Sequence, residues 1–197
     1  AIEPDVITFS AVISAMEKAA KWQKAESYFN MMQKHNIQPD AITLNALLEA
    51  LEKGKQHRKA DSLITSNTLT RNTDARTLLE QYQQSQGLRK PCLSFHKLKT
   101  GKRTWQYGID LHYLSANVAR VVVRTALNEL RDILKLERSS HPTEAIIVVG
   151  KGNNIPLNRN DGVAKVGPAI LALVRDELKL EIVPHSTNSG ALIVTLE

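Results

Sequence analysis

The chain has 197 residues, and its content of 42% hydrophobic and 23% charged residues is typical of a globular protein. It contains no run of about 18 apolar residues, which excludes a membrane-spanning helix. Its single cysteine, Cys92, excludes an internal disulfide and a zinc cluster built on cysteines. This length allows one large domain or two small ones.

The first third of the chain repeats itself with a period of 35 residues. Val6–Ile13 (VITFSAVI) aligns with Ala41–Leu48 (AITLNALL), and Ile2–Asp5 aligns with Ile37–Asp40. A period of this length is typical of a solenoid of helical pairs. The aspartate that ends each of the two shorter segments follows a proline and is expected to cap the first helix of its unit.

Each unit carries apolar residues at helical spacing, which predicts two helices per repeat. A further helix from about Asn72 to Gln86 is expected to close the array as a polar-backed cap, because Gln83 and Gln86 break its apolar pattern. The predicted core residues are Phe9, Val12, Ile13, Met16, Ala25, Tyr28, Phe29, Met32, Leu44, Leu47, Leu48, Leu51, Ala60, Leu63, Ile64, Ala75, Leu78, Leu79 and Tyr82.

The unit VITFSAVISAMEKAAKWQKAESYFNMMQKHNIQPD resembles the pentatricopeptide repeat (PPR), and the resemblance covers Ala1 to about Ser66. It implies binding of single-stranded RNA, one base per repeat. In that family the fifth residue of the first helix and the last residue of the repeat select the base. On this chain Ser10 with Asp40 is a purine-type pairing, with guanine expected, and Asn45 has no clear partner. Two repeats read about two bases, so either further repeats precede Ala1 or these two act as a scaffold.

A basic segment follows the helices. Between Gly87 and Gly108 there is no acidic residue, and the six basic residues there equal the net charge of the whole chain, which is 26 minus 20, or +6. Such a segment favours a polyanionic partner, nucleic acid first, and the alternative is a solvated linker. Residues 87–104 are predicted to be a linker with a short strand at 92–95. Its basic residues are Arg89, Lys90 and the predicted RNA contacts Lys97, Lys99, Lys102 and Arg103.

The remaining residues, 105–197, predict a small α/β domain of order βαβαββ, whereas residues 1–86 form the all-α repeat segment. The first three strands are expected to be parallel and the last antiparallel. The first helix is expected to turn Arg120, Arg124 and Arg131 away from the core. The predicted elements are strands at Ile109–His112, Ala145–Val149, Glu181–Pro184 and Ala191–Leu196, and helices from about Ala116 to Leu136 and from near Pro168.

The alternating stretch Ile109-Asp110-Leu111-His112 predicts a strand that carries Asp110 and His112 side by side, before an N-cap at Ser115. The second strand ends in a glycine turn of the kind whose backbone N–H groups can hold phosphate. A histidine can act as base or acid, and an aspartate can orient it or bind a divalent ion. Alternatively, the two side chains are a structural pair that supports the turn. The turn is Gly150-Lys151-Gly152-Asn153-Asn154.

The motifs IDLH, VGKG and NSGALIVTL, in this order of elements, resemble the small MutS-related (Smr) domain over about Trp105 to Glu197. In nuclease-active Smr domains the Asp-x-His motif is implicated in catalysis and the Gly-x-Gly loop in holding nucleic acid. These roles fall on Asp110, His112 and the glycine turn at 150–152. Two positions depart from the family, because Tyr113 stands where glycine is usual and Val149 where threonine is common.

The whole chain therefore resembles PPR-Smr proteins, a class found mainly in mitochondria and plastids. This resemblance implies an organellar RNA-binding protein, with single-strand endonuclease activity in RNA processing and, beyond a divalent metal ion, no expected cofactor. The alternative is a non-catalytic structural or assembly subunit. In that case the helical repeats would dock on a large organellar complex such as a ribosome, a photosystem or a respiratory complex.

Overall fold

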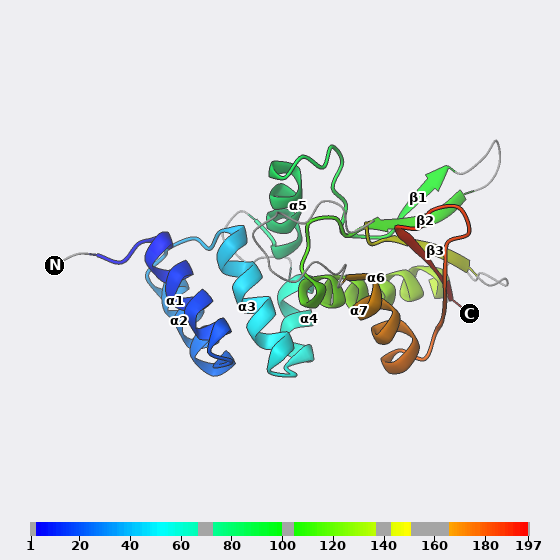
Figure 1. The fold of residues 1–197 in the computed structure, drawn as a ribbon. Coiled ribbons are helices and arrows are strands. Elements are labelled where there is room, and N and C mark those ends of the chain that lie inside the picture. The colour runs from blue at the N-terminus through cyan, green and yellow to red at the C-terminus, as the bar shows by residue number, and fades with distance from the viewer. Residues whose placement is uncertain (1–2, 67–72, 100–104, 137–142, 151–165, 197) are drawn as a thin grey trace. The chain divides into compact units, whose positions relative to one another are not determined.

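The computed structural model describes residues 3–66, 73–99, 105–136, 143–150 and 166–196. The chain divides into two compact units, Ala1–Tyr82 and Gln83–Glu197, and the boundary falls within a helix. The first unit is helical and the second combines a sheet with helices, as the sequence pattern predicts (Figure 1). None of the described helices has the length and apolarity needed to cross a membrane.

The first unit consists of helical hairpins. The helices are α1 (Val6–Lys18), α2 (Trp22–Lys34), α3 (Ala41–Lys53), α4 (His57–Thr65) and the larger part of α5 (Ala75–Ser85). Helices α1 and α3 start 35 residues apart, and so do α2 and α4, which confirms the predicted repeat. Helix α3 packs against α1, α2 and α4. Helix α5 is shorter at both ends than predicted.

Every first helix of a repeat begins at an aspartate whose carboxylate accepts the backbone N–H of a threonine three residues later. The caps predicted at Asp5 and Asp40 are therefore confirmed. Helix α5 begins in the same way, although the sequence pattern marked it only as a cap of the array. The Oδ1–N distances are 2.8 Å for Asp5–Thr8, 2.8 Å for Asp40–Thr43 and 2.7 Å for Asp74–Thr77.

The apolar stripes form the core of this unit. Most predicted core residues are buried, whereas Val12, Met16, Tyr28, Leu63, Leu78 and Tyr82 are half-buried. Burial of such stripes supplies most of the stability of short helices. The buried members are Phe9, Ile13, Ala25, Phe29, Met32, Leu44, Leu47, Leu48, Leu51, Ala60, Ile64, Ala75 and Leu79.

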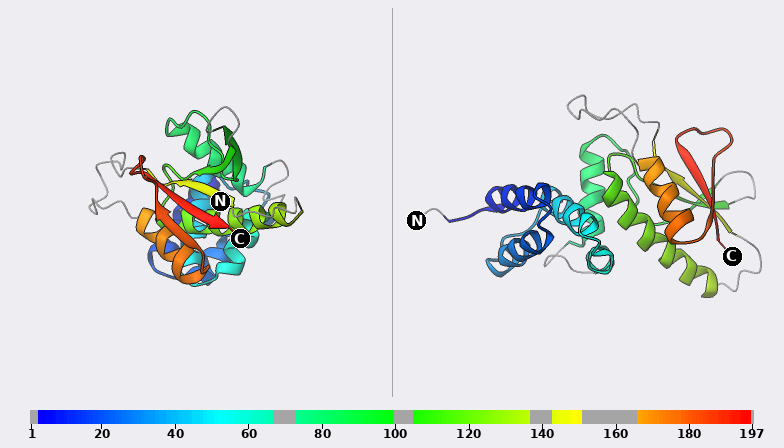
Figure 2. Two further views of the ribbon diagram at one scale, coloured as in Figure 1. Left: turned by 90° about the vertical axis from the view of Figure 1, so that its right-hand side faces the viewer. Right: turned by 60° about the horizontal axis from the view of Figure 1, so that its bottom comes forward.

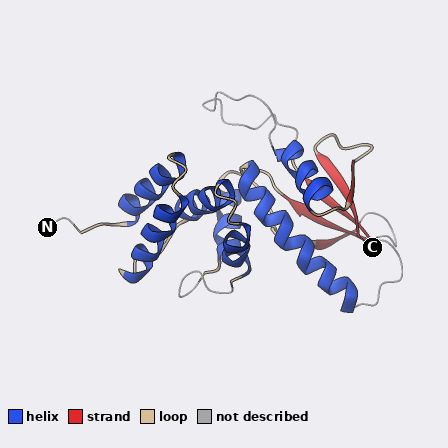
Figure 3. Cartoon of the chain, turned by 90° about the horizontal axis from the view of Figure 1, so that it is seen from below, coloured by secondary structure: helices blue, strands red, loops and turns tan. Residues whose placement is uncertain are grey.

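The second unit contains a sheet, whose strands are red in Figure 3. This sheet has five strands in the order β1-β2-β3-β5-β4. Strands β2 and β3 are parallel, and the other neighbours are antiparallel. Strands β2, β3 and β4 consequently run in one direction and β5 runs against them, as predicted. The strands are β1 (His96–Lys99), β2 (Trp105–Asp110), β3 (Thr143–Val148), β4 (Glu181–Pro184) and β5 (Ala191–Leu196).

The short strand predicted at residues 92–95 is wrong, because the strand forms at His96–Lys99 and pairs with β2 from His96↔Gly108 to Lys99↔Trp105. An edge strand tolerates lysines, which discourage pairing with other chains. Its lysine-rich sequence therefore lacks the apolar alternation by which strands are recognised. Lys97 and Lys99 lie on a strand of this unit rather than in a linker without secondary structure.

Two helices lie on one face of the sheet (Figure 2). Helix α6 (Ala116–Leu136) has the predicted bounds, and its Ser115 cap accepts from the Val118 N–H at 3.3 Å. Helix α7 (Val166–Ala172) continues as the π-helix η1 (Leu173–Glu177). The expected outward position of Arg124 is wrong, because this residue is 8% exposed. Almost every residue of α6 from Val118 to Leu127 is buried, so this part of the helix is covered on nearly all sides.

Candidate functional site

The first candidate site lies where α1 meets the start of α3. The predicted RNA-reading pair is in contact there, since Ser10 Oγ lies 3.4 Å from Asp40 Oδ1 and 2.5 Å from Thr43 Oγ1. Asp40 Oδ1 also accepts from the Thr43 N–H and hydroxyl, at 2.8 and 2.7 Å. Ser10 is buried and Asp40 is half-buried, so the carboxylate is the more accessible of the two groups. Asn45, which is also half-buried, is the fifth residue of α3.

Two exposed isoleucines stand on the first helices of these repeats. Ile7 is 73% exposed and Ile42 is 60% exposed, and they occupy equivalent positions 35 residues apart. Each is the second residue of its helix and lies outside the core stripe. Sequence reasoning missed them, although the recurrence of an apolar residue off the stripe was a visible signal. Their recurrence at equivalent positions of the two repeats makes these side chains candidates for a contact surface.

The second candidate site lies at the end of β2. The predicted strand through His112 is wrong in part, because β2 ends at Asp110. The residues His112 and Tyr113 form a turn. Asp110 Oδ1 accepts the backbone N–H of His112 at 2.9 Å and lies 2.6 Å from its Nδ1. The two side chains thus meet through an aspartate turn rather than through the pleat. Ile109 and Leu111 are buried, as expected.

The contact with Asp110 determines which nitrogen of His112 can react. An ionised carboxylate only accepts hydrogen bonds, so Nδ1 carries the proton of the neutral ring and Nε2 keeps its lone pair. The side chains of His112 and Asp110 are 30% and 27% exposed, so both reach the surface. The geometry therefore offers an oriented histidine base at the protein surface.

The glycine turn begins beside this ring. Gly150 has a φ of +78°, and a Cβ built on it would lie 3.0 Å from Cδ2 and Nε2 of His112. The N–H groups of Val149 and Gly150 both donate to the Gly190 carbonyl, at 2.8 and 3.1 Å. This bonding fixes the end of β3 and leaves Gly150 N–H directed at protein. Any phosphate-binding N–H groups must therefore come from residues later in the turn.

Tyr113 borders the same ring. Its φ of +66° lies in the left-handed region, where glycine is favoured over any other residue. The rings of His112 and Tyr113 are 6.2 Å apart between centroids and tilted by 49°, so the phenol lies beside the imidazole.

Gln83, in the last turn of α5, was missed as a site residue. Its Nε2 donates to the backbone carbonyls of Asp110 and His112, at 3.0 and 2.8 Å, and it is 0% exposed. The only signal in the sequence was a glutamine at an apolar position of the helix. A buried polar side chain normally has a partner that explains its burial.

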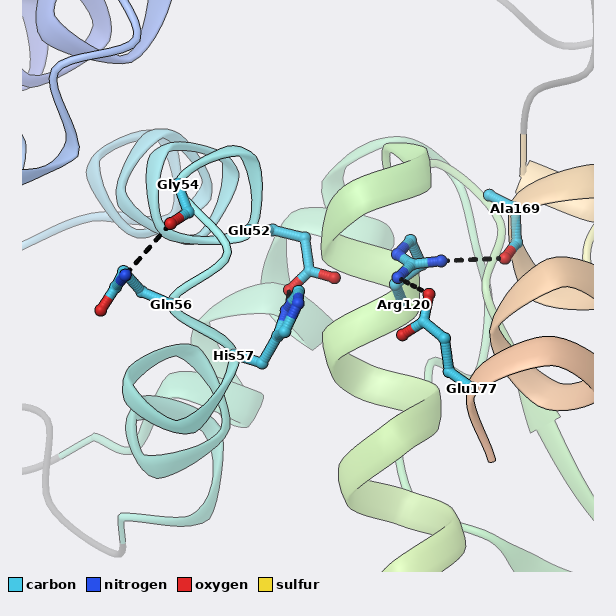
Figure 4. Close-up of polar contacts among 7 residues, drawn as sticks. All are labelled: Glu52, Gly54, Gln56, His57, Arg120, Ala169 and Glu177. Carbon is cyan, nitrogen blue, oxygen red and sulfur yellow. Dashed lines mark hydrogen bonds and ion pairs between the residues drawn. The ribbon is translucent and has the colours of Figure 1, made fainter. Parts of the chain in front are cut away.

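The two helices behind the site are tied to each other. Arg120 of α6 donates to the Ala169 carbonyl at 3.4 Å and pairs with Glu177 at 2.5 Å (Figure 4). Helix α7 also approaches the end of β3, because a Cβ on Gly167 would lie 3.7 Å from Val149 Cγ2. These contacts connect both helices to the strand end that carries Gly150.

Residues 4–63 match the model of the PPR repeat family. We call this matched segment, residues 4–63, the PPR segment. The match includes Ser10, Asp40 and Asn45, together with the two exposed isoleucines. No curated protein matches the chain at a significant level. Because PPR repeats bind RNA, the PPR segment indicates an RNA-binding protein.

Asp74 lies beyond the matched PPR segment but occupies the place of Asp40. It immediately precedes α5 as Asp40 precedes α3, and each caps its helix through a threonine. The spacing between them is 74 minus 40, or 34 residues, one fewer than the period. A search for Asp-x-x-Thr without a fixed period would have found it. Asp74 is therefore the structural counterpart of the residue that ends the first repeat.

Several predicted RNA contacts lie outside the described residues: Lys151, Gly152, Asn153, Asn154, Lys102 and Arg103. The backbone of Lys99 is part of β1. Lys97 Nζ lies 5.6 Å from the ring centroid of the buried Tyr107. Within the described part of the chain, no group of three or more His, Cys, Asp or Glu side chains could hold a metal ion.

In the PPR segment a buried acid also joins two helices. Glu52 of α3 has a side chain that is 2% exposed, and its Oε2 lies 2.9 Å from Nδ1 of His57 at the start of α4. In the turn between these helices, the Gln56 side chain donates to the Gly54 carbonyl at 3.1 Å (Figure 4). These bonds hold the second hairpin together.

Proposed function

We propose that this chain binds single-stranded RNA and that its second unit is an Smr-like domain that cuts the bound strand during organellar RNA processing. The contact of His112 with both Asp110 and Gly150 is the observation that carries the catalytic part. The PPR segment supports the RNA-binding part.

In this proposal Asp40 selects the first base. Its Oδ1 is engaged by Ser10 and Thr43, so the base is recognised mainly through the other carboxylate oxygen. A carboxylate only accepts hydrogen bonds, and it therefore favours a base edge that carries N–H donors, as guanine does. Asn45 with Asp74 forms the second reading pair, because Asp74 stands where Asp40 stands one repeat earlier.

The isoleucines provide the apolar part of this surface. Ile7 and Ile42 occupy the same position on successive first helices and are both exposed. The face of a nucleobase is apolar. When it packs on an isoleucine side chain, apolar surface of both groups is removed from water, which is favourable. Affinity would then come from the isoleucines and selectivity from the acidic residues.

The proposed cleavage step uses the protonation state of the Asp110–His112 pair, in which Nε2 of His112 is free to accept a proton. Nε2 of His112 takes the proton of the neighbouring 2′-hydroxyl as this oxygen attacks the phosphorus, and the bond from phosphorus to the 5′-oxygen breaks. The leaving 5′-oxygen takes a proton from solvent, and Asp110 stabilises the imidazolium that has formed. Lys151 and Gly152 hold the phosphate, because the N–H of Gly150 is bonded to Gly190. Among the described residues no group of three or more His, Cys, Asp or Glu side chains could hold a metal ion, and the proposal assigns no step to one.

A second function is favoured by one observation, the ring of Tyr113 beside His112. If this ring blocks access of a phosphate, the second unit is non-catalytic. The chain is then a structural or assembly subunit that docks on a large organellar complex.

The test is incubation of end-labelled single-stranded RNA with wild-type protein, His112→Ala and Asp110→Ala. His96→Ala is the matched control, because His96 is exposed on β1. We expect the site variants to cut about 100-fold or more slowly and the control to match wild type. Equal rates in all four proteins would reject the nuclease. Binding without cutting, weakened as salt rises, would support RNA binding alone.

A further inference from the structure

The last turn of α5 holds a polar side chain in a fully buried place. Gln83 is 0% exposed, at a helix position where the apolar stripe predicts a hydrophobic residue. Its neighbours Gln84, Ser85 and Gln86 are exposed, so burial is particular to this residue. The side chain is therefore directed at a definite target.

The backbone of Gln83 is itself fixed. Its carbonyl accepts the N–H groups of Gln86 and Leu88, at 3.2 and 3.1 Å, while Gly87 N–H donates to Gln84. Gly87 has a φ of +102°, and this bonding closes the helix with a Schellman motif. The amide thus extends from a rigid helix end.

The amide reaches the two residues that form the histidine–carboxylate pair. Nε2 donates to the carbonyl of Asp110 at 3.0 Å and to the carbonyl of His112 at 2.8 Å. Only Leu111 separates these carbonyls, so one amide sets the backbone spacing of the turn. That spacing in turn sets the short contact between Asp110 Oδ1 and His112 Nδ1.

A purely space-filling role does not explain the residue. Gln83 Oε1 is buried and has no hydrogen-bond partner among the described residues. Such an acceptor is costly to bury, and a methionine of similar length would fill the space without this cost. What the glutamine adds is its pair of donated bonds.

We propose that Gln83 is a positioning residue, which holds the backbone of Asp110 and His112 so that the carboxylate keeps the proton on Nδ1 and leaves Nε2 as the reacting atom. The effect on cleavage rests on the proposed nuclease function. The effect on the histidine ring does not, and it can be measured in a protein that cuts nothing.

The test is ¹⁵N NMR of the His112 ring in the full chain, with the signal assigned by its loss in His112→Gln. Wild type should show a protonated Nδ1 and an unprotonated Nε2. Gln83→Met should show both tautomers and about tenfold faster exchange of the Nδ1 proton, because a misplaced partner weakens the bond. Gln84→Met is the matched control, since it makes the same change at an exposed position of the same helix.

Gln83→Asn provides a second variant if Gln83→Met does not fold, because its amide is one methylene too short to reach both carbonyls. Unchanged ring signals in either folded variant would overturn the proposal. Altered signals together with no RNA cleavage by wild type would keep the positioning role and reject the nuclease. If wild type cuts RNA, Gln83→Met should lower kcat about tenfold with KM little changed.

Discussion

Gly150 lies against the imidazole of His112, so that a Cβ at position 150 would come within 3.0 Å of both Cδ2 and Nε2. Strands β2 and β3 are parallel neighbours, which brings the strand ends that carry these residues together. Ligands of α/β sheets usually bind at such carboxyl ends. The absence of a side chain at Gly150 is what leaves room for the ring.

Gly150→Ala should therefore impair the site more than the fold. The left-handed φ costs about 1–2 kcal/mol for alanine, and the added methyl group must displace the ring of His112. We expect a loss of stability of this size in urea unfolding and a changed ¹⁵N signal of the ring. Gly167→Ala is the control, since its Cβ meets Val149 Cγ2 at an ordinary 3.7 Å. An unchanged ring signal in Gly150→Ala would contradict the contact.

Tyr113→Gly should stabilise the protein, because Tyr113 has a φ of +66°. Relief of the strain, less the greater freedom of glycine in the unfolded chain, amounts to roughly 0.5–1 kcal/mol. Chemical denaturation measures this gain. Tyr113→Ala removes the ring but leaves a residue other than glycine in the left-handed conformation. Comparison of this variant with Tyr113→Gly therefore separates the effect of backbone strain from the effect of access to His112. If only the ring limits cleavage, both variants should cut RNA faster than wild type.

Gly54→Ala should destabilise the PPR segment. Its φ is an ordinary −77°, but a Cβ there would lie 2.4 Å from Cδ1 of Trp22. The indole must move out of its packed position, and overpacking of this kind costs about 1–3 kcal/mol. Lys55→Gly, one residue later, should have the opposite sign because Lys55 has a φ of +56°. Thermal unfolding measures the Tm of both variants. Equal shifts of Tm would refute the close approach of Gly54 to Trp22.

Sequence reasoning succeeded for those elements that are marked by a regular local spacing of apolar or capping residues. The repeat period, the caps at Asp5 and Asp40 and the bounds of α6 depend on local spacing, and all agree with the structure. Strand β1 was misplaced because an edge strand rich in lysine has no apolar alternation. Arg124 was misjudged because burial of α6 on nearly all sides depends on packing between elements.

At the candidate sites the limits are of the same kind. The proximity of Asp110 and His112 was predicted, but from a strand pleat, whereas an aspartate turn brings them together. Gln83 joins them across 27 and 29 residues of sequence, and no local pattern reveals such a contact. Asp74 was hidden by a spacing one residue short of the period.

Asp5 should make a measurable contribution to the acid sensitivity of the protein. The backbone N–H of Thr8 and then its hydroxyl lower the pKa of Asp5 below its ordinary value of 3.8. A lowered pKa in the folded state means that this stability is present above the ordinary pKa and is lost as the pH falls through the lowered one. Asp5→Asn keeps an acceptor for the cap but does not titrate. The difference in Tm between wild type and Asp5→Asn should therefore shrink on acidification from about pH 6 to about pH 2, and a constant difference would contradict the assignment.

Ile7→Ser and Ile42→Ser should weaken RNA binding without weakening the fold. Both side chains are exposed, so their removal should change stability by less than about 0.5 kcal/mol. Loss of an apolar contact with a base should raise Kd about five- to tenfold for each substitution, which corresponds to roughly 1 kcal/mol. Met31→Ser on α2 is the control, because Met31 is also exposed, at 43%, but lies on a second helix of the repeat. Fluorescence anisotropy with a labelled RNA strand measures all three. If Met31→Ser weakens binding as much as the isoleucine variants do, RNA does not prefer the surface formed by the first helices.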